Sequence, residues 1–225
     1  NLYFGEGDAT AVLDAVGRHK VDVLVLVEVT DAALTRLEAA GMDAILPNQI
    51  GVPRDGAQGT VIRSRWPMAL LDTVGSFPRL HAEPSVRVIV PGGKALTLRA
   101  VHVLAPTSGE ADAWRRGLAD LRTWADAQPS DAAVVMAGDF NASADHPGLR
   151  ELSATFLDAT RSVGATWVAT WPTGLVIPPV IHIDHILIRG LSVVDAGTET
   201  IPGSDHAAVW ARLSVTTPSQ GTPGS

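Results

Sequence analysis

Apolar positions in the first part of the chain follow a helical period and then a continuous run. Residues 8–19 carry apolar side chains at helical spacing, namely Ala9, Val12, Leu13 and Val16. The next segment, VDVLVLV, is rich in β-branched residues and leucine. The first pattern predicts an amphipathic helix, and the second predicts a strand buried on both faces. A second helix is predicted at about residues 30–40, with Thr30 or Asp31 as its N-cap and Gly41 at its end.

Further apolar segments alternate with turns through the rest of the chain. Strands are predicted at DAIL, GTVIRSR, MALLDTV, VRVIV, ALTLRAVHV, AAVVMAG, HIDHILI, LSVVDAG and AAVWARLSV. The PGGK segment after VRVIV predicts a hairpin, because glycines adopt the positive φ of a tight turn. Residues 109–127 form a predicted helix closed by Pro129, with a core-facing stripe of Trp114, Leu118, Leu121 and Trp124. Strands and helices joined by hairpins as well as crossovers predict α/β sheets packed face to face, with helices outside.

Length and composition favour one domain. The chain has 225 residues, 46% of them hydrophobic, which is enough to bury a full core. We assign the domain to residues 1–216, and we expect residues 217–225, rich in Pro, Gly, Ser and Thr, to form a flexible tail. The opening NLYF resembles the end of a protease-cleavage tag. Because Phe4 continues into GEGD, a good turn and helix N-cap, the native interpretation is favoured.

Charge and cysteine content narrow the chemistry. The formal charge is -7, and the two lysines and scattered arginines form no basic cluster, which argues against tight binding of long nucleic acid. Cysteine is absent, so disulfides, thiolate metal sites and a cysteine nucleophile are excluded. Any metal must be bound through oxygen or imidazole. No apolar run reaches the roughly 18 residues that a membrane span needs.

Polar residues stand at the ends of the predicted strands. They are Glu28, His102, Asp139, Asn141, Asp184, Asp205 and His206. Each has an ordinary alternative, such as a helix cap, a core histidine or an Asx turn. Together, four carboxylates, an amide and two histidines make a set that can hold a hard divalent cation and move protons.

These residues occur in motifs that resemble a known superfamily. The ordered set VEVT, GTVIRSRWP, AVHVLAP, GDFN, HIDHIL and GSDHAAV is similar to the endonuclease/exonuclease/phosphatase superfamily over nearly the whole chain. The resemblance implies a four-layered α/β sandwich, in which two mixed β-sheets pack face to face with helices on both outer sides. It also implies hydrolysis of a phosphoester.

The resemblance assigns a metal site. Glu28 matches the glutamate that binds the catalytic Mg²⁺, and Mn²⁺ is an alternative cofactor. Asp205 matches a carboxylate that faces the metal. Asn1 matches the asparagine at the end of the superfamily's first strand, which contacts the metal site or its waters. Carboxylate and amide oxygens suit such hard cations.

The resemblance also assigns catalytic roles. Asp139 matches the aspartate that positions or deprotonates the attacking water, and Asn141 the amide that donates to a phosphate oxygen. His206 matches the histidine beside the scissile phosphate, acting as base or as electrostatic clamp, and Asp184 matches the acid that orients it. His102 resembles a second histidine that contacts phosphate or protonates the leaving oxygen. Such a set provides a nucleophile, charge neutralisation and a proton donor.

The sequence departs from the superfamily pattern in three places. Val27 replaces a common glutamine before the metal-binding glutamate, and GTVIRSRWP offers no clear glutamate to pair with His102. The superfamily also has a strand that would precede Asn1. We therefore expect a parent protein that continues upstream, and we favour an extracellular or membrane-anchored catalytic domain over a cytoplasmic one.

The predicted function is metal-dependent hydrolysis of a phosphodiester or phosphomonoester. A non-catalytic binding domain that keeps the fold and a non-specific nuclease are the alternatives. The acidic charge favours a small molecule or lipid headgroup as the substrate over long nucleic acid, with the protein as a monomer without a stable partner. Trp66, Trp167 and Trp171 are candidates for lining a pocket, and Arg63 and Arg65 for contacting phosphate, although loop packing and solvation are their commoner roles.

Overall fold

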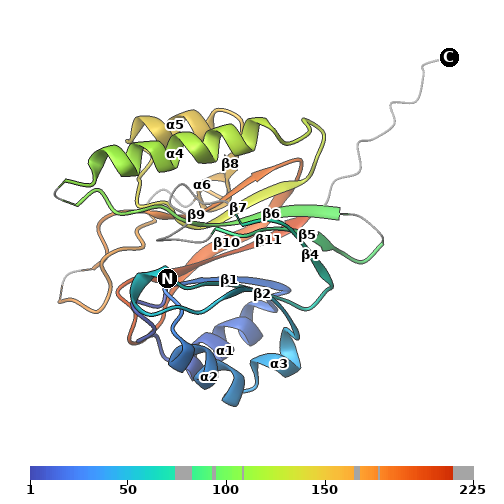
Figure 1. Ribbon diagram of the computed structural model, residues 1–225, viewed down its shortest axis with the longest axis vertical. Helices are drawn as coiled ribbons and strands as arrows, with labels where there is room; N and C mark the ends of the chain where they lie inside the picture. Colours follow the sequence, from blue (N-terminus) through green and yellow to red (C-terminus); the bar gives the residue numbers. More distant parts are fainter. Residues whose placement is uncertain (74–82, 93–94, 108, 165–167, 177, 215–225) are drawn as a thin grey trace.

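The computed structural model describes residues 1–73, 83–92, 95–107, 109–164, 168–176 and 178–214 (Figure 1). Helices form its two outer layers, and β-sheets lie between them. This arrangement confirms the predicted α/β sandwich with helices on both outer sides. The six-stranded sheet is one inner layer, and two smaller antiparallel sheets face it. The predicted tail, residues 217–225, lies outside the described residues.

The first part of the chain forms a helical layer and a three-stranded sheet. Its elements are α1 (Ala9–His19), β1 (Val23–Val27), α2 (Asp31–Ala39), α3 (Met42–Ile45), β2 (Asn48–Val52), the short 3₁₀ helix η1 (Gly56–Gln58) and β3 (Thr60–Ser64). The strand order is β1-β3-β2, with antiparallel pairs. Asp8 caps α1 by accepting a hydrogen bond from the Ala11 amide at 2.7 Å, and Thr30 caps α2 in the same way. The predicted first strand and both predicted helices are therefore present.

The six-stranded sheet has the order β4-β5-β6-β7-β9-β8. Its strands are β4 (Met68–Asp72), β5 (Ser85–Ile89), β6 (Ala95–His102), β7 (Val134–Asp139), β8 (Leu157–Asp158) and β9 (Asp184–Arg189). Only β6 and β7 pair in parallel among these described strands, because helix α4 (Ala111–Asp126) returns the chain to the same edge. Two short helices, α5 (Pro147–Ser153) and α6 (Ala159–Ser162), complete this half.

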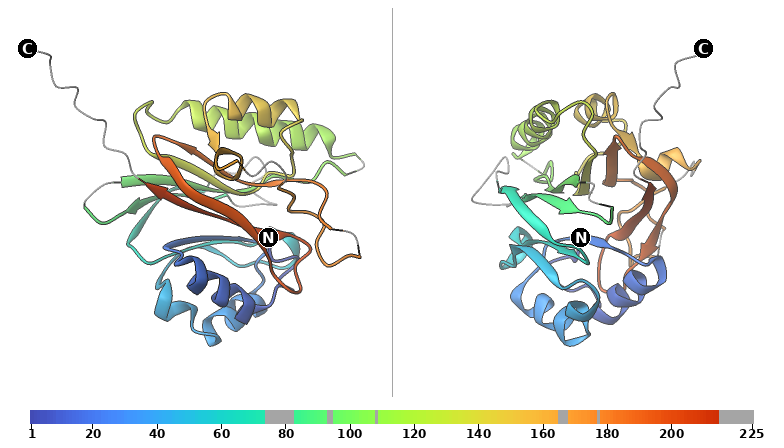
Figure 2. Two further views of the ribbon diagram at one scale, coloured as in Figure 1. Left: turned by 180° about the vertical axis from the view of Figure 1, so that it is seen from behind. Right: turned by 90° about the vertical axis from the view of Figure 1, so that its right-hand side faces the viewer.

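The last two strands form a separate hairpin, β10 (Ser192–Thr200) and β11 (Ala207–Ser214). Figure 2 shows this hairpin along one side of the sandwich in the right-hand view. The strand β11 begins at Ala207, directly after the polar loop of the site described below. It ends at Ser214, the last residue that the structure describes. No described helix is long and apolar enough to span a bilayer.

The core lies on both faces of the large sheet. Leu118 and Leu121 of α4 are buried in one cluster, and Trp114 and Trp124 pack against it, as the apolar stripe predicts. A second cluster joins α1 and α2 to the start of the chain, where Leu2 is buried. A third cluster lies between the sheets. The buried apolar faces thus hold the sandwich together, as expected when burial of apolar area dominates folding.

The structure corrects several local predictions. The DAIL segment forms the helix α3 instead of a strand, because a short apolar run has no period that separates the two structures. The strand β2, the helices α5 and α6 and the strand β8 were not predicted, since their sequences are short and mixed in polarity. The predicted hairpin is confirmed by the antiparallel pairing of β5 with β6, while residues 93 and 94 of its turn lie outside the described residues.

Candidate active site

The predicted polar residues gather at one end of the sandwich. In the large sheet, His102 is in register with Asp139 on the parallel strand β7, and Asp139 is in register with Asp184 on β9. Glu28 directly follows β1, and His206 directly precedes β11. Strand direction and register therefore bring residues from distant parts of the chain to the same level. All five side chains are buried.

Asn1 and Glu28 form one side of the site. The Asn1 amide donates hydrogen bonds to Glu28 Oε1 at 2.9 Å and to Asp139 Oδ2 at 3.1 Å. The other oxygen of Glu28 accepts from the Phe4 amide at 2.8 Å, and Glu28 itself has a positive φ of 57°. The Leu2 amide donates to the Val27 carbonyl at 3.0 Å. The first residues of the chain thus hold the Glu28 carboxylate beside Asp139.

The GDFN segment is a turn built to present Asp139. Gly138 has a φ of +138°, and a Cβ atom there would lie 2.1 Å from the Val101 carbonyl oxygen on the neighbouring strand. Phe140 is fully buried and anchors the turn. The Asn141 amide N–H donates to Asp139 Oδ1 at 2.8 Å, which is an Asx turn, and its side-chain nitrogen donates to the Val103 carbonyl at 2.8 Å. Glycine is required here because any side chain would separate β7 from β6.

His206 and Asp184 form a buried pair opposite Asn1. Nδ1 of His206 lies 2.8 Å from Asp184 Oδ2, which directs the other ring nitrogen into the site. Nε2 of His206 lies 3.8 Å from Asp139 Oδ2 and 3.8 Å from Asp205 Oδ1. An acid on one imidazole nitrogen fixes the orientation of the ring and stabilises its protonated form.

The charges of this group shift one another's pKa values. Burial alone would lower the pKa of His206, but the hydrogen bond and charge of Asp184, with the charge of Asp139, raise that pKa above its ordinary value. Burial would likewise raise the pKa of Asp184, yet the hydrogen bond from His206 holds it below its ordinary value. Burial and the nearby Asp184 carboxylate raise the pKa of Asp139 to about 7. Asp139 can therefore exchange a proton near neutral pH.

Asp205 lies at the mouth of the site. Its Oδ2 accepts a hydrogen bond from the Trp171 indole at 3.2 Å, and its main chain is tied to Thr173 through a 2.7 Å hydrogen bond. The loop is also tied to the chain start, because Ser204 Oγ donates to the Asn1 carbonyl at 2.8 Å and accepts from the His206 amide at 3.0 Å. Trp171, one of the pocket candidates, thus contacts a site residue.

His102 lies between two glutamates. Its Nε2 is 3.7 Å from Glu28 Oε1, and its backbone amide donates to Glu83 Oε1 at 3.2 Å. Glu83 is buried and also pairs with Arg99 at 3.1 Å. Burial raises the pKa of Glu83, which Arg99 opposes. GTVIRSRWP has no acid near this histidine, and the glutamate beside the His102 backbone, Glu83, lies in the segment before β5.

One further buried histidine, His185, was not among the predicted site residues. Nδ1 of His185 lies 2.7 Å from Asp158 Oδ2, and Nε2 lies 2.8 Å from the Ala142 carbonyl oxygen, one residue past GDFN. The two ring nitrogens therefore connect the end of β8 to the turn after β7. The His182 ring lies beside it, with ring centroids 4.2 Å apart. We call the contacts of His185 with Asp158 and Ala142 the His185 brace. The signal for it in the sequence was the second histidine of HIDHIL, which directly follows the site residue Asp184.

Other candidates from the sequence lie elsewhere. Arg63 is buried at the opposite end of β3, where it pairs with Asp43 at 2.6 Å, and Arg65 pairs with Asp22 at 3.0 Å. Both arginines lie at the end of the sheet away from the site. The site follows the end of β1, and β3 runs antiparallel to β1, so the end of β3 lies beside the start of β1. Trp66 packs against the core between the sheets. Trp167 lies outside the described residues.

The donor atoms of the site fit a hard divalent cation. Glu28, Asp139 and Asp205 contribute carboxylate oxygens, whereas Asn1 turns its amide nitrogen toward Glu28 and Asp139 and its oxygen accepts from the Tyr3 amide at 2.8 Å. Ligand atoms of Asp139, Asp184 and His206 all lie within 4.8 Å of one another. The buried Oδ1 of Asp205 accepts no hydrogen bond from any described residue, although carboxylate oxygens in proteins normally do. Oxygen ligands of this kind suit Mg²⁺ or Mn²⁺.

The chain also matches a protein-family model. Residues 1–206 match the Endonuclease/Exonuclease/phosphatase family, which covers the whole site from Asn1 to His206. The chain belongs to this family. Its members hydrolyse phosphoesters as phosphodiesterases, nucleases and phosphatases, and they generally use divalent metals.

Solved structures of endonuclease/exonuclease/phosphatase proteins share the fold. D. rerio TDP2 complexed with single strand DNA product is similar with a TM-score of 0.73 and 19% identity, covering 92% of this chain and 91% of that chain. An endonuclease/exonuclease/phosphatase from Beutenbergia cavernae has a TM-score of 0.69 and 18% identity, and the match covers 96% of this chain and 70% of that chain. The human Nocturnin catalytic domain with bound sulfate anion has a TM-score of 0.65 and 17% identity, and the match covers 92% of this chain and 85% of that chain. Comparison with curated protein sequences found no match.

Proposed function

We propose that the protein hydrolyses a phosphoester with a water molecule activated at Asp139, with help from a divalent cation. The arrangement of Asp139, His206 and Asp184 carries this proposal, because one acid orients an imidazole that faces a second acid 3.8 Å away. A pair of acid and base groups whose pKa values are shifted by burial and by each other is typical of hydrolytic sites.

Each side chain has a distinct part in the proposed reaction. Asp139 takes a proton from the attacking water, which its pKa of about 7 allows at neutral pH. The His206 ring, held by Asp184, stabilises negative charge on the phosphate and donates to it. His102 donates to the leaving oxygen. Asn141 positions the turn and donates to a phosphate oxygen with the N–H that remains beside its bond to Val103.

A divalent cation would be held by the carboxylate oxygens of Glu28 and Asp205, and by the oxygen of Asn1 if its amide turned away from the Tyr3 amide that it accepts from here. When bound, it neutralises charge on the phosphate and lowers the barrier to attack. The Asn1 amide now donates to both neighbouring carboxylates, so it keeps these like charges close together. This role of the chain start links the metal side of the site to Asp139.

We further propose a small-molecule or lipid-headgroup substrate and a monomeric protein. The net charge of -7 disfavours long nucleic acid. Exposed apolar side chains follow the site residues on both sides: Tyr3 and Phe4 after Asn1, and Leu175, Val176 and Val180 after Trp171. Exposed apolar side chains in the segments that adjoin the site residues favour a substrate with an apolar part over a polyanion.

A substrate panel with and without Mg²⁺ tests the proposal. Plasmid DNA, bis-p-nitrophenyl phosphate, a phosphoinositide and sphingomyelin are incubated with the protein, and phosphate or cleaved ester is measured. We expect hydrolysis that excess EDTA abolishes, with the lipid or small ester turned over faster than DNA. A full rate in EDTA would contradict the cation requirement, and no turnover of any substrate would favour a non-catalytic binding domain.

A further inference from the structure

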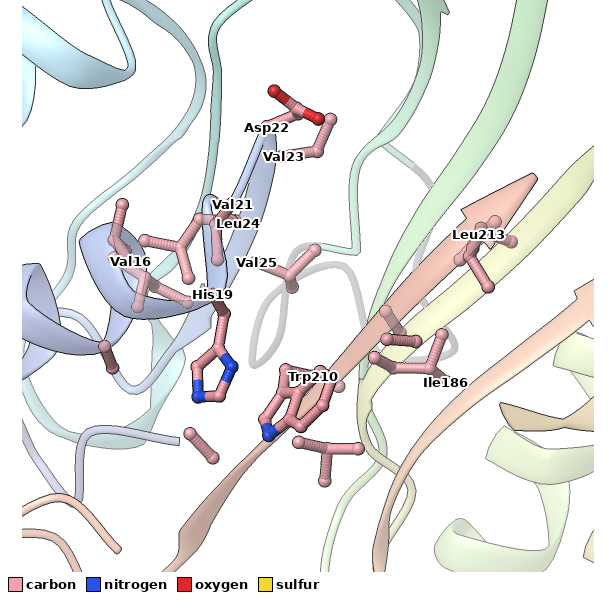
Figure 3. Close-up of a pocket in the computed structure, with 18 of the residues that line it drawn as sticks. Val16, His19, Val21, Asp22, Val23, Leu24, Val25, Ile186, Trp210 and Leu213 are labelled. Atoms are coloured by element: carbon pink, nitrogen blue, oxygen red, sulfur yellow. The ribbon is translucent and has the colours of Figure 1, made fainter. Parts of the chain in front are cut away.

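The histidines outside the active site differ in their surroundings. His19 lines a cavity of about 750 Å³ between α1, β1 and β11, where Figure 3 shows mainly aliphatic side chains near its ring. Its Nε2 already lies 2.7 Å from Glu199 Oε2. His182 and His185 instead form a group with Asp158, in which one ligand atom of each residue lies within 4.8 Å of the others. This second group has the composition of a metal site and takes no part in the proposed hydrolysis.

One ring nitrogen of this group is buried without a partner. Nε2 of His182 is shielded from solvent and has no hydrogen bond with any described residue. The His182 ring also has a hydrogen bond to the Asp184 backbone, which we assign to Nδ1 because Nε2 has none. Buried polar atoms normally have a partner. An unpaired imidazole nitrogen beside a carboxylate and a second imidazole is therefore a candidate metal ligand.

The other two side chains have the outer contacts that metal ligands need. Nε2 of His185 lies 2.8 Å from the Ala142 carbonyl oxygen, which leaves Nδ1 facing Asp158. Oδ1 of Asp158 accepts from the Thr160 amide at 3.0 Å and from the Thr160 hydroxyl at 2.7 Å, so Oδ2 is the oxygen turned toward His185. Metal-binding imidazoles and carboxylates typically have such outer hydrogen bonds, which fix their orientation.

Two imidazoles and one carboxylate favour Zn²⁺ over Mg²⁺, because Mg²⁺ prefers oxygen ligands. Zn²⁺ lies about 2.0 to 2.2 Å from such atoms in a tetrahedral site, which places the ligand atoms roughly 3.3 Å apart. Here Nδ1 of His185 lies 2.7 Å from Asp158 Oδ2, and no ligand atom of the group is more than 4.8 Å from another. His182 is only half-buried, so its ring can close on the ion while Ala142 holds His185.

We propose that Asp158 Oδ2, His182 Nε2 and His185 Nδ1 bind Zn²⁺, with water as the fourth ligand. The ion replaces the proton between Asp158 and His185, which is released to solvent, and the metal-free protein keeps their hydrogen bond. The bound ion joins the end of β8 to the segment before β9 and reinforces the His185 brace. This site shares no residue with the group of Asp139, Asp184 and His206, and it does not rest on the proposed function.

Metal titration of the whole chain tests this site. The protein is stripped of metal with a chelator, excess Mg²⁺ is added for the active site, and Co²⁺ is titrated as a visibly absorbing substitute for Zn²⁺. We expect one Co²⁺ to bind per chain with the strong absorption of a four-coordinate ion, and Zn²⁺ to displace it. Imidazole ¹⁵N NMR of the parent protein should show Zn²⁺ on Nε2 of His182 and on Nδ1 of His185. No bound Co²⁺, or unchanged resonances of both rings at saturating Zn²⁺, would overturn the proposal.

A ligand variant locates the ion. His182→Phe removes one ligand and keeps the Asp158–His185 hydrogen bond, so Zn²⁺ affinity should fall by at least about a hundredfold while circular dichroism stays unchanged. His146→Ala is the matched control and should keep the parent affinity, because this half-buried histidine lies near the same turn but outside the group. Zn²⁺ should raise the unfolding temperature of the parent by several degrees and leave that of His182→Phe unchanged. Parent-like affinity in His182→Phe would exclude the site. Loss of Zn²⁺ binding in Asp205→Asn, with His182 intact, would place the ion in the active site and overturn the proposal as well.

Discussion

Asp184 lies 2.8 Å from Nδ1 of His206, and both groups are buried. Burial favours the neutral imidazole, whereas the carboxylate favours the imidazolium. The raised pKa of His206 indicates that the hydrogen bond and charge of Asp184, with the charge of Asp139, together outweigh burial. Changing Asp184 therefore separates its influence from that of burial.

Asp184→Asn should lower the pKa of His206, because burial then acts without the opposing negative charge. The amide keeps the size of the side chain, so the fold should be retained. NMR titration of the imidazole resonances in metal-free protein measures this pKa directly. An unchanged His206 pKa would show that Asp184 does not control the ring.

Asp139→Asn and His206→Ala should each lower turnover by at least about two orders of magnitude, the usual cost of removing a general base or charge-stabilising group. Circular dichroism and thermal unfolding should stay close to those of the parent protein. Asp145→Asn is the control, because this exposed aspartate lies just past GDFN and outside the site. Near-parent turnover in either site variant would refute the role assigned to that residue.

The turn after β7 depends on elements that are distant in sequence. Gly138 lets β7 approach β6, Phe140 anchors the turn in the core, and His185 of β9 holds the Ala142 carbonyl. Asp158 at the end of β8 holds His185 in turn. Burial would raise the pKa of Asp158, but the hydrogen bond and charge of His185 hold it at about 2. The position of Asp139 is thus supported by three neighbouring strands and by the chain start.

His185→Ala should destabilise the fold by about 3 kcal/mol, because the buried Asp158 carboxylate loses its imidazole partner and keeps only the hydrogen bonds from Thr160 and Arg161. The double variant Asp158→Ala/His185→Ala should lose less than the sum of the two single variants. Denaturant unfolding of all four proteins measures these differences. His146→Ala is the comparison, since this half-buried ring also accepts a backbone hydrogen bond near the turn and should cost less. Strict additivity would show that the two side chains do not act as a pair.

The stability of the whole molecule should vary with pH through His182. Burial, and then the charge of His185, lower the pKa of His182 from 6.5 to about 4. As the pH falls below 6.5, the unfolded chain binds a proton first, so the free energy of unfolding falls until about pH 4. The raised pKa of Asp139 acts in the opposite direction over part of this range, so a difference between variants is needed.

His182→Phe should remove this part of the pH dependence. The difference in unfolding free energy between parent and variant should change by about 1 to 3 kcal/mol between pH 6.5 and pH 4, after allowance for the partial exposure of the ring. Above pH 7 the difference should be constant. Denaturant unfolding across this range provides the measurement, and parallel curves for the two proteins would show that His182 does not titrate on unfolding.

Local patterns in the chain were sufficient to predict many elements. The stripe of α4, the caps of α1 and α2 and the apolar runs of β1, β7 and β9 follow from periodicity and capping alone, because these signals lie within a few consecutive residues. The GDFN and SDH motifs likewise pointed to Asp139 and His206. Short or polar elements such as β2 and α6 have no such signal, and DAIL satisfies both periods, so their structure depends on what they pack against.

Only the tertiary structure decided which polar residues meet. Register across β6, β7 and β9 brings His102, Asp139 and Asp184 to one level, and the direction of β3 takes Arg63 to the other end. Burial then sets the pKa of Asp139 near 7, and it does so through neighbours far away in sequence. The brace at His185 and the cavity between β1 and β11 arise in the same way. Such features are sums over long-range contacts, and a linear pattern carries no information on which strands become neighbours.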